Sequence, residues 1–164
     1  MRILGVDPGL VTTGYGVISD SSSRGTRGVV ELIEVGVIRT KADSGIAARL
    51  NRIYRALQEV VSEFEPDVLV IEKLYTHYRH PATAILMGHV RGVVCLVSGA
   101  SDIPLVSIAA THVKKSVAGR GHAGKEQVGR MVERYLSLKP MSAPSDATDA
   151  LAIALSYVLN RRPG

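Results

Sequence analysis

Four acidic residues of this chain stand where carboxylates can act together. Asp7 and Glu72 each close a short apolar segment that is typical of a β-strand, and a residue at a strand end reaches the rim of a sheet. Asp146 and Asp149 are three residues apart at the start of a helical pattern, which places both side chains on one helical face. If the four meet, they form an all-oxygen site, which suits Mg²⁺ or Mn²⁺ better than zinc.

The chemistry of such a site is phosphodiester hydrolysis. At an effective dielectric of 20, a pair of carboxylates 4 Å apart repels by about 4 kcal/mol, so a metal-free cluster needs raised pKa values. Two divalent ions about 3.5 to 4 Å apart would remove that cost and clamp the attacking and leaving oxygens around an in-line attack by water. The alternative for Asp146 and Asp149 is structural, because aspartates in a first turn also cap the helix; for this pair alone that interpretation is the stronger.

A basic, glycine-rich segment between His112 and Lys125 contains no acidic residue and predicts contact with phosphate. Its candidate DNA-binding residues are Lys114, Lys115, Arg120 and Lys125. Lys125 stands at the start of a predicted helix, where free N–H groups also favour phosphate. The alternative is that the paired lysines only solvate a helix face.

Two other patterns in the chain imitate known sites. Residues 119–125 have the GxxxxGK pattern of a nucleotide-binding P-loop. However, Glu126 stands where a Ser or Thr would hold Mg²⁺, and the preceding segment has a helical pattern where a P-loop has a strand. A P-loop is therefore rejected. The five histidines are scattered without the spacing of a zinc site. Residues 77–80, with two of these histidines, form a basic loop that could touch DNA.

Composition favours one soluble domain that binds a polyanion. The 164 residues are 46% hydrophobic and carry a formal charge of +5, which predicts a single domain over residues 1–164 with a nucleic-acid partner. The chain has one Phe and no Trp, so an aromatic near the site, such as Tyr75, gains importance for base stacking. Cys95, the single cysteine, excludes an intramolecular disulfide, and its apolar neighbours predict a buried thiol.

No signal peptide or membrane span is expected. The apolar stretch at the start is too short for a signal peptide, and no apolar run approaches the ~20 residues that a bilayer requires. These observations predict a cytoplasmic protein without membrane contact.

The predicted elements alternate between strands and helices. We expect strands at 2–6, 14–19, 29–39, 68–71 and 104–108, with Asp7 and Glu72 following the first and fourth. Helical spacing begins at Ile46, at Lys125 and near Ala147, and a short helix is expected around Val113. The apolar stretch from Pro81 to Ala100 predicts a largely buried helix. The order predicts a mixed α/β sheet flanked by helices.

Five segments together resemble RuvC-type Holliday-junction resolvases in order and spacing over nearly the whole chain. They are GVDPGLVTTGYGVI, VIRTKAD, VIEKLY, AATHVKKSVAGRGHAGKEQVGRMV and SDATDALAIAL. The resemblance implies a ribonuclease-H-like fold, a homodimer that binds four-way DNA junctions, and Mg²⁺-dependent paired nicking with two ions per active site, for which Mn²⁺ substitutes. It also makes the branch-migration proteins RuvA and RuvB candidate partners.

Individual residues match the family's motifs. Asp7, Glu72, Asp146 and Asp149 occupy its catalytic positions. Lys114 and Lys125 fall where these nucleases place lysines near the scissile phosphate. Tyr75 falls where an aromatic side chain contacts junction bases, and its alternative is an ordinary packed tyrosine.

Three other functions compete with this interpretation. Actin-like and sugar-kinase ATPases share the DxGxxxxG opening that begins at Asp7, but they duplicate the fold and need a longer chain than this one. A YqgF-type nuclease acting on RNA, or a nucleic-acid-binding module that does not cut, would fit the basic charge. The complete carboxylate set argues against a pure binder.

Overall fold

The computed structural model describes residues 1–22, 28–73, 81–138 and 144–161. Their elements follow one another as β1 (Arg2–Asp7), β2 (Thr12–Asp20), β3 (Val30–Arg39), α1 (Ile46–Phe64), β4 (Val68–Glu72), α2 (Pro81–Ala100), β5 (Leu105–Ile108), α3 (Ala110–Ala118), α4 (Lys125–Tyr135) and α5 (Ser145–Arg161). The predicted strands and helices are thus present, with β2 three residues longer than expected.

The strands form one sheet in the order β3-β2-β1-β4-β5. β2 runs antiparallel to β1 and to β3, whereas β4 is parallel to β1 and β5 is parallel to β4. Parallel neighbours need a crossover, which α1 and α2 supply. As a result β1, β3, β4 and β5 all end at the same edge of the sheet, which we call the carboxyl edge. The predicted mixed α/β sheet is confirmed.

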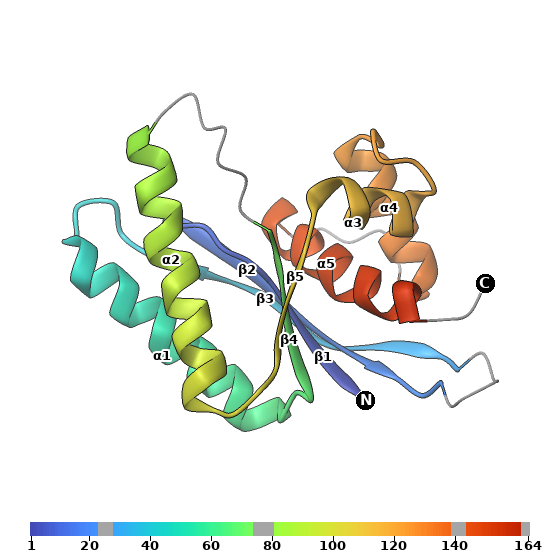
Figure 1. Cartoon of the computed structure of the whole chain (residues 1–164), viewed down its shortest axis with the longest axis horizontal. Helices are drawn as coiled ribbons and strands as arrows, with labels where there is room; N and C mark the ends of the chain where they lie inside the picture. The colour runs from blue at the N-terminus through green and yellow to red at the C-terminus, as the bar shows by residue number, and fades with distance from the viewer. Residues whose placement is uncertain (23–27, 74–80, 139–143, 162–164) are drawn as a thin grey trace.

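Helices cover both faces of the sheet (Figure 1), with α1 and α2 on one side and α3, α4 and α5 on the other. Successive side chains of a strand point to opposite faces. In β1, Ile3 belongs to the core beneath α5, while Leu4 and Val6 belong to the core beneath α1 and α2. In β4, Val70 belongs to the core beneath α5 and Leu69 to the core beneath α1 and α2.

Glycines in the two central strands let α5 lie directly on the sheet. A Cβ on Gly5 would collide with the carbonyl of Ala150, and a Cβ on Gly14 would collide with the carbonyl of Asp146. Gly16 pairs with Gly5 across the β1–β2 ladder and packs against Leu151. The absence of side chains at these positions brings the backbone of α5 unusually close to β1 and β2.

The prediction of a largely buried α2 is wrong. Val90, Val94 and Val97 are buried against the sheet side, but Ile85 and Leu96 are 61% and 59% exposed. Cys95 is exposed as well, so the buried-thiol prediction is also wrong. An apolar run predicts the helix but cannot say how many of its faces are covered.

The exposed helix also corrects the expectation that no apolar run reaches membrane-spanning length. Residues Ala82–Ala100 have a mean hydropathy of 1.5 in their most apolar window, which is 22% buried, and are long enough to cross a bilayer. Because α2 packs on α1 and supplies valines to the core beside the sheet, its inner face belongs to the folded domain.

Candidate active site

Asp7 and Glu72 lie side by side at the carboxyl edge. The register pairs Gly5 with Val70 and Val6 with Ile71, so the next pair along the two parallel strands is Asp7 with Glu72. Neighbouring strands are about 4.8 Å apart. Side chains an even number of residues apart on a strand point to the same face. Asp7 is four residues after Ile3 and Glu72 is two after Val70, both of which pack beneath α5, so both acids face that helix.

The turn that follows Asp7 is held by its own hydrogen bond. The Thr13 hydroxyl, which is fully buried, donates to the Gly9 carbonyl at 2.7 Å. This contact closes the Asp7-Pro8-Gly9 turn from the start of β2 and keeps Asp7 at the end of its strand.

Asp146 and Asp149 enter the site from the first turns of α5. Asp146 lies over Gly14, and Gly14 is the partner of Asp7 in the β1–β2 ladder. The close approach described above therefore carries both helix aspartates to the carboxyl edge. The two strand acids and the first turns of α5 thus lie at the same edge of the sheet, and their union in one metal site stays a prediction.

The charges of the other three acids act on Asp7. Burial raises the pKa of Asp7 from 3.8 to about 7, and the charges of Asp149, Glu72 and Asp146 add to that rise, while Lys125 opposes it. Burial also raises the pKa of Glu72, with Asp149 adding to the effect. The cluster therefore disfavours its own full ionisation, as like charges in a partly buried site must.

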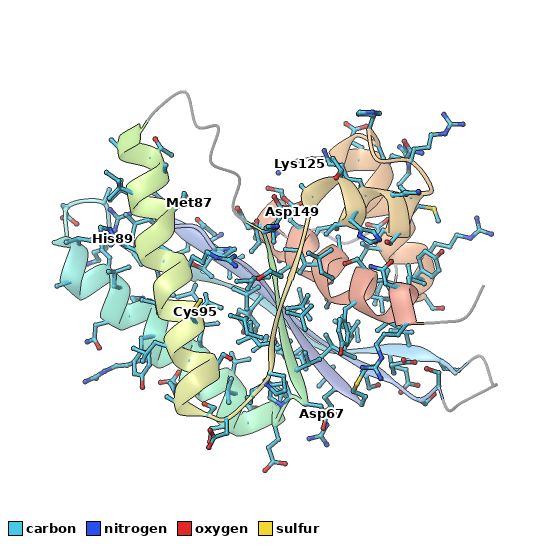
Figure 2. The ribbon with its side chains drawn as sticks, viewed as in Figure 1. Asp67, Met87, His89, Cys95, Lys125 and Asp149 are labelled. Carbon is cyan, nitrogen blue, oxygen red and sulfur yellow. The ribbon has the colours of Figure 1, made fainter. Side chains whose placement is uncertain are left out.

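Two lysines offset part of this negative charge. The Lys125 ammonium donates to an Asp149 carboxylate oxygen at 2.7 Å, a contact between the start of α4 and α5 that Figure 2 shows. This bond raises the pKa of Lys125 and keeps it cationic. The charges of Lys114 on α3 and Lys125 oppose the rise in the pKa of Glu72. Lys114 therefore lies within electrostatic range of the site.

Sequence reasoning missed Arg91, which fixes the position of Glu72. Its guanidinium donates through Nη1 to the Glu72 carbonyl at 2.7 Å and through Nη2 to the Ser107 hydroxyl at 2.8 Å. The side chain thus ties α2 to the ends of β4 and β5. A single cation within an otherwise apolar helix was the signal available in the sequence.

The carboxylates fit a divalent cation by chemistry more than by their present spacing. All four candidate side chains offer oxygen donors, and a cation would relieve both the burial of the Asp7 charge and its repulsion by the other three acids, which together raise the pKa of Asp7. Among the described residues, however, no three His, Cys, Asp or Glu side chains are grouped tightly enough to hold an ion as they stand. The Lys125 ammonium occupies one oxygen of Asp149 in this arrangement.

Other predicted residues lie outside this cluster. Lys115 and Arg120 are exposed, and neither has an ion pair within the part of the chain that the structure describes. Tyr75 and the loop 77–80 fall outside the described residues. The GxxxxGK sequence follows α3 instead of a strand, so the rejection of a P-loop is confirmed.

Comparisons with known proteins agree with the geometry. The family described as "Crossover junction endodeoxyribonuclease RuvC" matches residues 3–157. A protein of that description from Rhodopirellula baltica is 42% identical over 153 residues, covering 93% of this chain and 83% of the relative. Another from Paramagnetospirillum magneticum is 42% identical over 161 residues, covering 98% and 93%.

Solved structures agree as well. The Thermus thermophilus RuvC structure aligns with a TM-score of 0.87 at 31% identity, covering 97% of this chain and 94% of that one. The same protein in complex with Holliday junction substrate aligns with a TM-score of 0.90, also at 31% identity, covering 99% and 95%. The predicted ribonuclease-H-like fold is therefore confirmed.

Proposed function

The chain belongs to the RuvC family of crossover junction endodeoxyribonucleases, and from this membership we infer that it resolves four-way DNA junctions by paired, symmetric nicks in recombination and repair. The family match over residues 3–157 carries the inference. The convergence of four carboxylates at the carboxyl edge supplies chemistry suited to a phosphodiester. We propose that residues 1–164 act as one nuclease domain.

We propose that Asp7, Glu72, Asp146 and Asp149 are the catalytic metal ligands. Nucleases of this family depend on metal, and the finer proposal is two Mg²⁺ ions per site with Mn²⁺ as a substitute. When bound, such ions would neutralise charge on the phosphate and activate the attacking water. Support comes from the oxygen donors and from the pKa of Asp7, which burial raises and the charges of the other three acids raise further. Lys125 donates to one oxygen of Asp149, which leaves the other oxygen of that carboxylate for a metal ion.

We propose that Lys114 and Lys125 contact the phosphate backbone at the cutting site. Both are near enough to alter the pKa of Glu72, so a phosphate held by the carboxylates would meet their ammonium groups. Lys115 and Arg120, exposed beside them, are proposed to contact phosphates farther away. Tyr75 is proposed to stack on junction bases.

We propose that two copies of the chain associate through the exposed face of α2. Paired nicks in opposite strands require two active sites, and α2 presents Ile85, Leu86 and Leu96 to solvent. A Cβ on Gly88 or Gly92 would meet nothing within 4 Å, so a second helix has room to approach closely. Exposed apolar surface of this kind marks protein interfaces.

Family membership alone supports two further proposals. RuvA and RuvB are the candidate partners, and the cytoplasm, where bacterial DNA is held, is the proposed location.

The deciding experiment compares cleavage of a synthetic four-way junction with that of a linear duplex of the same sequence, in Mg²⁺ and then in EDTA. Metal-dependent paired nicks confined to the branch are expected. The Asp7→Asn variant should bind the junction but not cut it, whereas Glu59→Gln, which removes an exposed carboxylate on α1, should cut normally. Binding without cutting in Mg²⁺ and Mn²⁺ by the wild type would favour a module that does not cut, and cutting of RNA alone would favour the RNA nuclease.

A further inference from the structure

A basic pocket, separate from the carboxylate site, opens where β3 passes into α1. Its volume is about 420 Å³, and its lining residues are Arg39, Thr40, Lys41, Ser44, Ala48, Arg49 and Arg52. None of the active-site carboxylates or lysines lines it. We propose that this pocket binds a backbone phosphate of the junction DNA, several nucleotides from the phosphate that is cut. The proposal rests on the DNA-cutting function inferred above and adds a site to it.

Charge is the first argument. Four of the seven lining residues are cationic and none is acidic. Within the part of the chain that the structure describes, the ion pairs are Arg2 with Glu65 and Lys125 with Asp149, so no carboxylate is paired with a lining cation, although Asp43 lies nearby in the sequence. Like charges around one cavity repel, and an anion placed between them relieves that repulsion.

The arginines are held in place before any ligand arrives. Arg49 donates through Nε to the Thr40 hydroxyl at 2.9 Å and through Nη2 to the Leu10 carbonyl at 3.1 Å. Arg52 donates through Nε to the Arg39 carbonyl at 2.8 Å. A guanidinium has five N–H donors, so both side chains keep donors free. Fixed guanidinium groups with spare donors suit the oxygens of a phosphate, and their fixation lowers the entropy lost on binding.

The pocket also reaches the start of α1. Gly45, the residue before the helix, offers no side-chain cap, and the first turn contains no acidic residue. Ser44 and Ala48 line the pocket, so it reaches this uncapped turn. The first N–H groups of a helix have no partner within the helix and favour an anion.

The position of the pocket explains why the anion would belong to DNA. The Leu10 carbonyl accepts bonds from both Thr40 and Arg49, and Leu10 is three residues after Asp7. Three residues span at most about 11 Å, and along a duplex that distance corresponds to roughly three nucleotides of one strand. A strand whose phosphate lies at the carboxylates therefore has further phosphates within reach of the pocket.

The test is the double variant Arg39→Gln/Lys41→Gln. These side chains have no hydrogen bond or ion pair within the described residues, unlike Arg49 and Arg52, so their loss leaves the loop contacts intact. The control is Arg161→Gln, which removes one exposed cation whose guanidinium contacts Tyr157 one turn earlier on the same helix. Arg161 ends α5 twelve residues after Asp149, which places it about 18 Å along the helix from the carboxylate site.

Affinity for a four-way junction and for a linear duplex is measured in EDTA over a range of salt concentrations. If the pocket neutralises one phosphate, the slope of log K against log salt becomes shallower by about 0.9 in the double variant. At 0.1 M salt this corresponds to roughly eightfold weaker binding, while the control keeps the wild-type slope. Equal slopes for the double variant and the control would overturn the proposal.

A second measurement distinguishes a DNA phosphate from a free anion as the ligand of the pocket. Inorganic phosphate is titrated into the wild type and the double variant by calorimetry. Tight phosphate binding that the double substitution abolishes, combined with unchanged DNA slopes, would identify a free-anion site and overturn the proposal. If the wild type neither prefers nor cuts junctions, the inferred function fails. The slope difference on linear duplex still decides whether the pocket holds a DNA phosphate.

Discussion

Replacing Asp7 with asparagine should stabilise the metal-free protein. The pKa of the Asp7 carboxyl rises from 3.8 to about 7 in the folded chain, chiefly through burial and then through the charges of Asp149, Glu72 and Asp146. A folded-state pKa above the unfolded value means that the ionised carboxylate destabilises the fold. This group therefore favours folding below about pH 4 relative to higher pH, and its contribution is lost as the pH rises toward 7.

The size of the effect follows from the shift. About three pKa units at 1.36 kcal/mol each give an upper limit of about 4 kcal/mol above pH 7. Asp7 is partly exposed, so water and side-chain movement screen the repulsion, and we expect about 1 to 3 kcal/mol. For a chain of this size that gain raises Tm by roughly 3 to 10 °C.

The assay is denaturant unfolding of wild type and Asp7→Asn in EDTA at pH 8 and pH 5, with Glu59→Gln as the control for loss of an exposed carboxylate. The gain in free energy of unfolding that Asp7→Asn gives at pH 8 should shrink by about half or more at pH 5, where the Asp7 carboxyl of the folded wild type is protonated. Added Mg²⁺ should raise the stability of the wild type more than that of the variant. A variant less stable than the wild type at pH 8 would refute the reasoning.

Three further perturbations test the geometry. Gly14→Ala should push α5 off the sheet and lower kcat by about 10- to 100-fold, whereas Gly129→Ala, whose Cβ would meet its nearest neighbour at 3.6 Å, should cut normally in the same nicking assay. Lys114→Ala should make the salt dependence of junction binding shallower by up to about 0.9, and an unchanged slope would return this side chain to a solvated helix face. If two copies associate through α2 as proposed, Leu96→Glu should shift the protein from dimer to monomer in sedimentation velocity. Val29→Glu, at a residue of similar exposure, should not, and a dimeric Leu96→Glu would exclude this face of α2.

The strands and helices were predictable because local patterns specify them. Short apolar runs ending at Asp7 and Glu72 gave the strands, and the three- and four-residue spacing after Ile46 gave α1. The spacing of Asp146 and Asp149 gave a shared helical face. These features depend on neighbours within a few residues, so the chain carries them before it folds.

Burial on α2 was not predictable for the same reason. Its apolar residues surround the helix, so no stripe marks the side that packs. The fold covers the face with Val90 and Val94 and leaves the face with Cys95 and Leu96 exposed. Which face a uniformly apolar helix buries depends on what lies against it in space.

The sequence by itself determined the residue types of the site and the elements that carry them. Only the tertiary structure decided that these residues lie at one edge of the sheet. Gly5 and Gly14 admit the backbone of α5 to the sheet, and the parallel register of β1 and β4 sets Asp7 beside Glu72. The basic pocket likewise joins the end of β3, the start of α1 and the turn after Asp7. Such convergence depends on close approach between segments far apart in the chain, and the physical reason is steric: local pattern does not encode which backbones have room to touch.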